Sequence, residues 1–84
     1  MEVRLRFFAS IREKLHRSEG SYQVPENATV RDVVDRLCRD HPVVEPLRAS
    51  VSVAVNCEYV DDAFVLHDGD EVALIPPVSG GSHV

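Results

Sequence analysis

Hydrophobic and polar residues alternate with a period of two in three segments of the chain. In residues 2–8 one face carries Val3, Leu5 and Phe7, while the other carries Arg4, Arg6 and Phe8. Residues 51–57 and 71–75 alternate in the same way. This period is typical of strands with one buried face. The pattern therefore predicts three strands, and a shorter segment over 21–24 is expected to pair with the first.

A different period governs the middle of the chain. Thr29 is a good N-cap residue, and Asp32 follows where the helix dipole favours an acid. The apolar residues that follow have helical spacing and form one stripe: Val30, Val33, Val34, Leu37 and Cys38. Pro42 cannot continue this helix, which predicts an end near Asp40.

Other segments carry signals for short elements. Ser10 and Glu13 have the spacing of a capping box, so we expect a short helix to begin at Ser10 and its segment to end at Gly20. Asp68-Gly69-Asp70 predicts a turn before the last strand, and Pro76-Pro77 predicts its end. Residues 43–50 give no clear pattern.

The predicted order of elements is strand, helix, strand, helix and then several strands. A single sheet with its main helix across one face buries every apolar stripe, which predicts an α+β fold. The 84 residues have room for one core. We expect a domain over 1–77 and a tail over 78–84.

Composition excludes several classes of partner. The net charge of −5 argues against nucleic acid and anionic membranes. No apolar run is long enough to span a bilayer, and the N-terminus lacks a signal-peptide pattern, so we expect a cytoplasmic protein. The histidines are scattered and expected at the surface, without metal-ligand spacing. Cys38 and Cys57 are interpreted as buried thiols.

Apolar residues also lie on the strand face that points away from the main helix. Phe8 and Ile75 both stand where their strands end, and Tyr59 is expected nearby. A sheet with one main helix has no layer to cover this outer face, so an apolar cluster there indicates a docking site. The alternatives are that the long loop of the first short helix folds over it, or that the strand register differs by one residue. Residues 51–84 carry six acidic residues and no Lys or Arg, which favours either ordinary acidic turns or a basic partner.

The C-terminal segment IPPVSGGSHV follows this face directly. The sequence has no Ser/His/Asp arrangement and no phosphate-binding loop, so the chain is not expected to be an enzyme on its own. Gly80 and Gly81 lack Cβ atoms and could pass through a narrow channel into another protein, with Pro76-Pro77 holding the tail extended.

Four stretches, RLRFFASIRE, ATVRDVVDRL, VAVN and LHDGDEVALIPPVSGG, resemble the small subunit of molybdopterin synthase. That family consists of ubiquitin-like β-grasp sulfur carriers. The resemblance implies a mixed sheet of about five strands, one main helix and a short helix. It also implies an interface with the large subunit of the synthase, formed by Phe8, Arg12, Tyr59, Ile75, Pro76, Pro77 and Val78.

The resemblance implies a chemical role for the tail as well. A ubiquitin-activating-type enzyme would use ATP to adenylate the Gly81 carboxylate, and a persulfide would convert it to a thiocarboxylate. Gly80 would allow passage into the large subunit, where sulfur goes to a pterin precursor. This chain itself would bind no cofactor and no metal.

One departure from the family is the extension Ser82-His83-Val84. While it is present, Gly81 has an amide carbonyl and cannot be adenylated. We expect a peptidase to cleave between Gly81 and Ser82; a cloning remnant and a chain that has lost carrier activity are the alternatives. Three other functions stay open: a thiamine-pathway sulfur carrier, a protein modifier joined to lysines, and an interaction domain with an inert tail.

Overall fold

The computed structural model describes residues 1–77, and these form five strands and three helical segments. In chain order they are β1 (Glu2–Phe7), α1 (Ala9–Leu15), β2 (Glu19–Gln23), α2 (Val30–Asp40), the 3₁₀ helix η1 (Pro42–Ser50), β3 (Ser52–Val55), β4 (Glu58–Val60) and β5 (Glu71–Ile75). The connection that lacked a pattern is thus η1. The predictions for Val78, Gly80, Gly81 and Ser82 lie outside the described residues.

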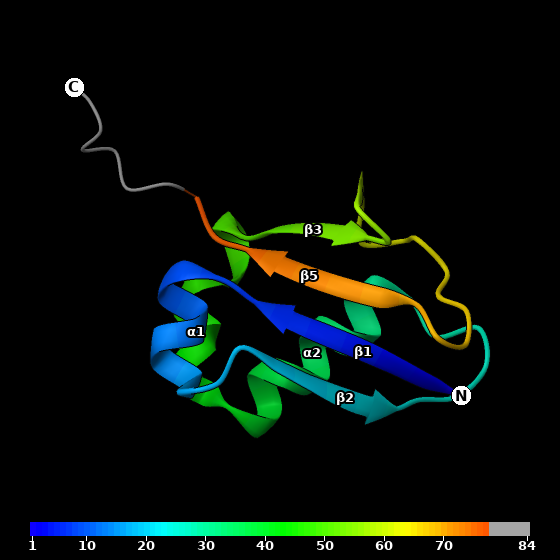
Figure 1. Cartoon of the computed structure of the whole chain (residues 1–84), viewed down its shortest axis with the longest axis horizontal. Helices are drawn as coiled ribbons and strands as arrows, with labels where there is room; N and C mark the ends of the chain where they lie inside the picture. Colours follow the sequence, from blue (N-terminus) through cyan, green and yellow to red (C-terminus); the bar gives the residue numbers. More distant parts are fainter. Residues whose placement is uncertain (78–84) are drawn as a thin grey trace.

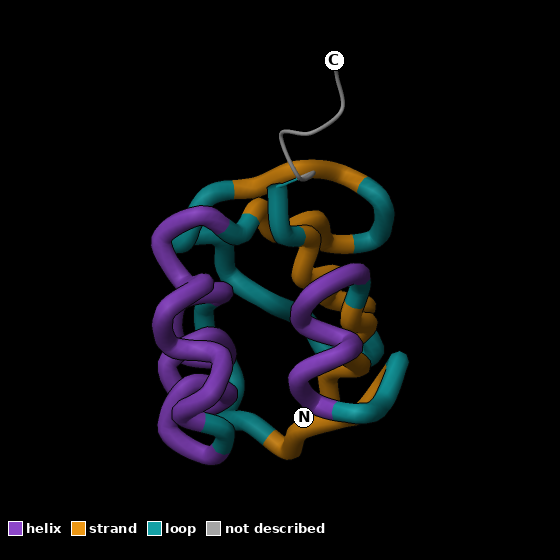
Figure 2. Tube along the Cα trace, turned by 90° about the vertical axis from the view of Figure 1, so that its left-hand side faces the viewer, coloured by secondary structure: helices purple, strands orange, loops and turns teal. Residues whose placement is uncertain are grey.

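All five strands form one mixed sheet in the order β2-β1-β5-β3-β4. The first and last strands, β1 and β5, run parallel at its centre, and every other neighbouring pair is antiparallel. Helix α2 lies behind the sheet in Figure 1, and Figure 2 shows the longer helical segments and the strands as separate layers. This confirms the predicted α+β class and the β-grasp arrangement.

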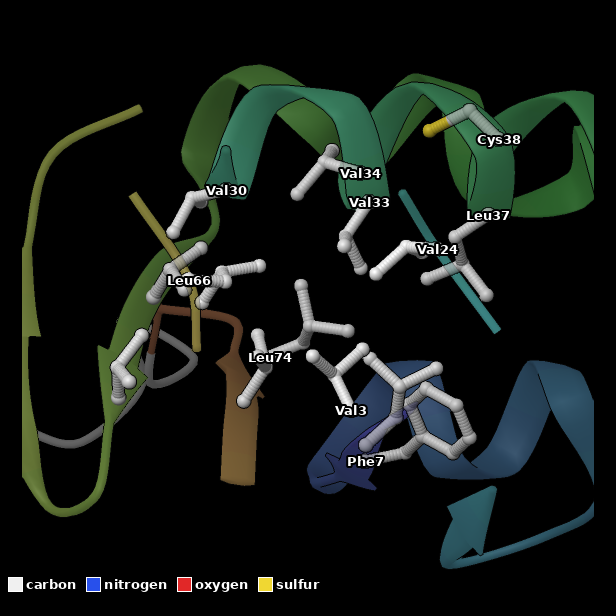
Figure 3. Packing of buried hydrophobic residues seen from close by; sticks show 14 of the residues in the cluster. Val3, Phe7, Val24, Val30, Val33, Val34, Leu37, Cys38, Leu66 and Leu74 are labelled. Atoms are coloured by element: carbon white, nitrogen blue, oxygen red, sulfur yellow. The ribbon is translucent and has the colours of Figure 1, made fainter. Parts of the chain in front are cut away.

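The inner face of the sheet forms the core together with α2. Strand β1 alternates exposed and buried residues as predicted, and Val72 and Leu74 of β5 are buried beside it. The whole predicted stripe of α2 faces these side chains (Figure 3). Burial of each such side chain contributes about 1.5–3 kcal/mol. The hydrophobic pattern therefore predicts the composition of the core correctly.

Helix α2 begins at the predicted cap. The Asp32 backbone N–H donates to Thr29 Oγ1 at 3.3 Å, and the Thr29 N–H donates to the Asp32 carboxylate at 2.9 Å. The Val30 and Arg31 N–H groups, which have no acceptor within the helix, donate to the carbonyls of Phe64 and Asp62. The loop after β4 thereby completes the N-terminus of α2, because it supplies acceptors that helix geometry leaves missing.

The prediction for the start of α1 is wrong. The helix begins at Ala9, its N-cap is Phe8, and no side chain caps it. The Phe8 carbonyl already accepts the Ile11 and Arg12 N–H groups, so Ser10 lies inside the first turn instead of in front of it. A capping residue must precede the helix to reach its free N–H groups, and here tertiary context sets the entry point.

The predicted end of this segment is also wrong. Helix α1 ends at His16, which adopts a left-handed conformation with φ of 58°. Gly20 lies within β2 instead, opposite Leu5 of β1. The pairing of β2 with β1 begins at Glu19, earlier than the apolar pattern of 21–24 indicates.

The interpretation of Cys57 as a buried thiol is wrong, whereas Cys38 is buried as expected. Strand β3 ends at Val55, and Asn56 and Cys57 both have positive φ, 51° and 73°, in the two-residue turn to β4. This turn interrupts the alternation, so Cys57 is exposed. Burial raises the pKa of the Cys38 thiol, with Glu45 adding to the effect.

Candidate docking surface and tail exit

The chain leaves the sheet at the end of β5, as predicted. Pro76 is buried and Pro77 is exposed. A groove at this point is lined by Phe8, Ala9, Ser10, Glu13, Ile75, Pro76 and Pro77. We call it the exit groove. Its apolar side chains come from the ends of the two central strands and the start of α1, so the position of the groove follows from the parallel pairing of β1 and β5 (Figure 1).

Next to the exit groove lies a second hollow on the outer face of the sheet. Register pairs Arg6 with Ala73, Ala73 with Ala54, and Ala54 with Tyr59, so these four residues form one row across four strands. The two alanines are the floor, since their side chains are the smallest in the row. We call this hollow of about 230 Å³ the alanine trough; its lining is Arg6, Phe8, Ala54, Cys57, Tyr59, Glu71, Ala73 and Ile75.

The apolar cluster expected on the outer face is present. Phe8 follows the pair Phe7–Leu74 in register, which places it beside Ile75. Both residues line the trough and the exit groove, and Tyr59 forms the far wall of the trough. The Tyr59 side chain is 72 % exposed. The segment over residues 9–20 does not cover this face: it contributes no residue to the trough and borders only the exit groove.

Arg12 lies on the exposed side of α1 and lines neither hollow. The structure thus places Tyr59 beside Phe8 and Ile75 in the trough, and Pro76 and Pro77 beside Phe8 and Ile75 in the exit groove. The Arg12 backbone N–H donates to the Phe8 carbonyl, but Arg12 is part of neither lining. Helix α1 buries Ile11. Arg12 is the next residue along the helix, and the helical period turns it away from the buried side.

Sequence reasoning missed four residues of the trough, among them Glu71, which counted only toward the acidic charge of the C-terminal half. Arg6 and Ala54 point outward, as the alternation predicts, but neither stood out as part of a site. Cys57 was expected to be buried and instead lines the wall. The strand order would have identified Arg6 and Ala54, because only the pairing of β1, β5 and β3 places them beside Ala73.

Two of the six acidic residues in the C-terminal half lie in the turn before β5. Asp68 and Asp70 flank Gly69, whose φ of 85° forms the expected turn in front of β5. Asp70 accepts hydrogen bonds there from the His67 backbone and from the Asn56 side chain. The full length of β5 separates these carboxylates from Pro76, so the acidic turn is a local structural feature.

Within residues 1–77 the potential metal ligands do not gather into a metal centre. In this part of the chain no three His, Cys, Asp or Glu side chains come together as metal ligands. The strongly raised pKa of Tyr22, about 12, arises from burial and from Asp40, away from both hollows. No helix of this part is long and apolar enough to cross a membrane. The arrangement is that of a binding surface beside a tail.

Residues 5–81 match the ThiS family. This chain belongs to that family. Its sequence is 35 % identical, over 96 % of the chain and 100 % of the relative, to the molybdopterin synthase sulfur carrier subunit of Chlamydomonas reinhardtii. The resemblance inferred from the four sequence stretches is therefore confirmed.

Solved structures agree with this assignment. A putative molybdopterin converting factor subunit 1 from Pyrococcus furiosus has a TM-score of 0.84 and 31 % identity, covering 93 % of this ThiS-family chain and 99 % of its own. SAMP1 from Haloferax volcanii has a TM-score of 0.87 and 30 % identity, with 96 % and 100 % coverage. Both support the β-grasp fold.

Proposed function

We propose that this ThiS-family chain is the sulfur carrier of a molybdopterin synthase, with Gly81 as the carrying residue. The observation that carries the proposal is the near full-length similarity to molybdopterin synthase sulfur carrier subunits. The surface fits the same role, because an uncovered apolar face lies directly beside the strand from which the Gly-Gly tail departs.

The chemistry requires a free carboxylate on Gly81. A peptidase would hydrolyse the bond between Gly81 and Ser82 and release Ser82-His83-Val84. An adenylating enzyme of the ubiquitin-activating type would then join the carboxylate to AMP from ATP, with pyrophosphate leaving. A persulfide sulfur would displace AMP, and a thiol would cleave the remaining S–S bond to give the thiocarboxylate and a disulfide. ATP and thiols of this kind belong to the cytoplasm, where we place the reaction.

In the next step the charged tail would deliver its sulfur to a pterin precursor bound by the large subunit of the synthase. Gly80 and Gly81 suit a narrow passage because they have no side chain. Phe8, Tyr59, Ile75, Pro76, Pro77 and Val78 would form the apolar contact. Burial of Phe8 and Ile75 would contribute about 1.5–3 kcal/mol each, before the cost of association. Arg12 would lie at the edge of this interface.

The experiment combines the chain truncated after Gly81 with an adenylating enzyme, ATP and a persulfide donor, followed by intact-mass measurement. We expect the mass gain of one sulfur replacing one oxygen. The full 84-residue chain is the matched control and should stay uncharged. No mass gain, under conditions that charge the Chlamydomonas carrier, would contradict the proposal.

A protein modifier is the second candidate, favoured by the similarity to SAMP1 of Haloferax volcanii and to a second solved structure named small archaeal modifier protein 1 from the same organism. In that function the Gly81 carboxylate would be joined to lysines of other proteins. Peptide mapping of conjugates from the native host distinguishes the two. Gly81 in isopeptide linkage supports the modifier, and a thiocarboxylate without conjugates supports the carrier.

A further inference from the structure

Besides Glu71, the one charged residue of the described chain that lines the trough is Arg6. Its side chain is 47 % exposed, and its guanidinium lies 5.5 Å from the centroid of the Phe8 ring. Glu71 is the one carboxylate within ion-pair distance among residues 1–77, with 3.9 Å between Arg6 Nη1 and Glu71 Oε2. At such a distance and exposure, an ion pair contributes little.

The guanidinium has more hydrogen-bonding capacity than this surface uses. Arginine carries five N–H donors in a planar fork, and within the described residues Arg6 donates no side-chain hydrogen bond. Ala73 and Ala54 beside it offer no polar side-chain atom. In the free chain, water therefore satisfies most of these donors.

A partner that covers the trough removes this water. Glu71 lies 3.9 Å from the guanidinium and accepts no hydrogen bond from it, so covering the trough leaves Arg6 buried with most of its donors unpaired. This is strongly unfavourable, and a partner must supply an acceptor at this position to bind well. A carboxylate matches the guanidinium fork better than any other side chain. The alanine floor next to it leaves a space that a bulky apolar side chain can fill.

We propose that Arg6 is a specificity residue of the trough, which selects a partner with a carboxylate opposite Arg6 and a bulky apolar side chain on Ala54 and Ala73. This inference rests on the proposed function, in which the partner is the large subunit of the synthase. Phe8 and Ile75 line both hollows, so the trough continues the surface at the tail exit. A partner that receives the tail therefore reaches Arg6 as well.

The test is calorimetric titration of the large subunit from the same organism with the chain truncated after Gly81, at low and high salt. R6L keeps an apolar wall but removes the charge, leaving the partner's carboxylate unpaired. We expect about tenfold to hundredfold weaker binding and a smaller dependence on salt. R6K keeps the charge without the planar fork and should bind with intermediate affinity.

R4L is the matched control, because Arg4 lies on the same face of β1 and pairs in register with Glu71 but does not line the trough. It changes the net charge equally and should bind nearly as well as the unmodified chain. Equal affinities of R6L and R4L would overturn the role of Arg6, while thermal unfolding checks that both variants are folded. Failure of the unmodified chain to bind the large subunit would overturn the proposed partner instead.

Discussion

The two faces of the sheet arise from the same alternation but differ in how they are completed. On the inner face, Val3, Leu5, Val72 and Leu74 are covered by α2 and make a closed core. On the outer face, the row from Arg6 to Tyr59 has no covering layer within the described chain. The period of the hydrophobic pattern therefore shows which residues share a face, whereas the use of that face depends on what packs against it.

The largest expected effect tests the inner face. Leu74→Ala removes a side chain that is 1 % exposed and leaves a cavity between the sheet and α2. We expect the free energy of unfolding to fall by about 2–5 kcal/mol, measured by urea denaturation. Val43→Ala, at an exposed residue of η1, is the control and should change it by less than about 0.5 kcal/mol. A similar cost for both variants would contradict the division of the faces.

The outer face should respond in the opposite way. Tyr59→Ala removes an exposed aromatic wall of the trough, so the free energy of unfolding should change little. Binding to the large subunit should weaken by roughly tenfold or more, because buried aromatic side chains often dominate interfaces. Titration calorimetry and urea denaturation of one preparation measure both quantities. Unchanged affinity would show that the trough is not the docking surface.

A smaller effect on the free energy of unfolding is expected to distinguish the N-terminus of α2 from that of α1. Thr29→Ala removes the cap of α2 and should lower the free energy of unfolding by about 1 kcal/mol. Ser10→Ala is the matched substitution in α1, where the hydroxyl caps nothing, and should have an effect within about 0.5 kcal/mol. Equal losses in denaturation experiments would mean that Ser10 has a capping role after all.

The smallest effect concerns the turn at the edge of the trough. Cys57 has a φ of 73° in a two-residue hairpin turn that favours glycine at this position. Cys57→Gly should stabilise the chain by roughly 0.5 kcal/mol, because relief of left-handed strain exceeds the entropy cost of glycine. Cys57→Ser keeps the strain and should leave the melting temperature unchanged. A lower melting temperature for the glycine variant would contradict this explanation.

Local signals in the sequence differ in how well they predict structure. Thr29 caps α2 through its own side-chain oxygen, and Pro42 and Gly69 act through their own backbone geometry, so all three predicted roles are confirmed. Ser10 and Gly20 carry equally good local signals, but the pairing of β2 with β1 decides where α1 begins and ends. Cys57 continues an alternating pattern beyond the end of its strand, and the hairpin turn reverses its exposure.

The inner face and the main helix follow from the amino-acid sequence alone, because periodicity is a property of consecutive residues. Periodicity also places Phe8 and Ile75 on the outer face, but the pairing of β1 with β5 brings them together. Likewise, Arg6, Ala73, Ala54 and Tyr59 form one row only after four strands have taken their order and register. The alanine trough is therefore absent from any single segment and arises only when the sheet is assembled.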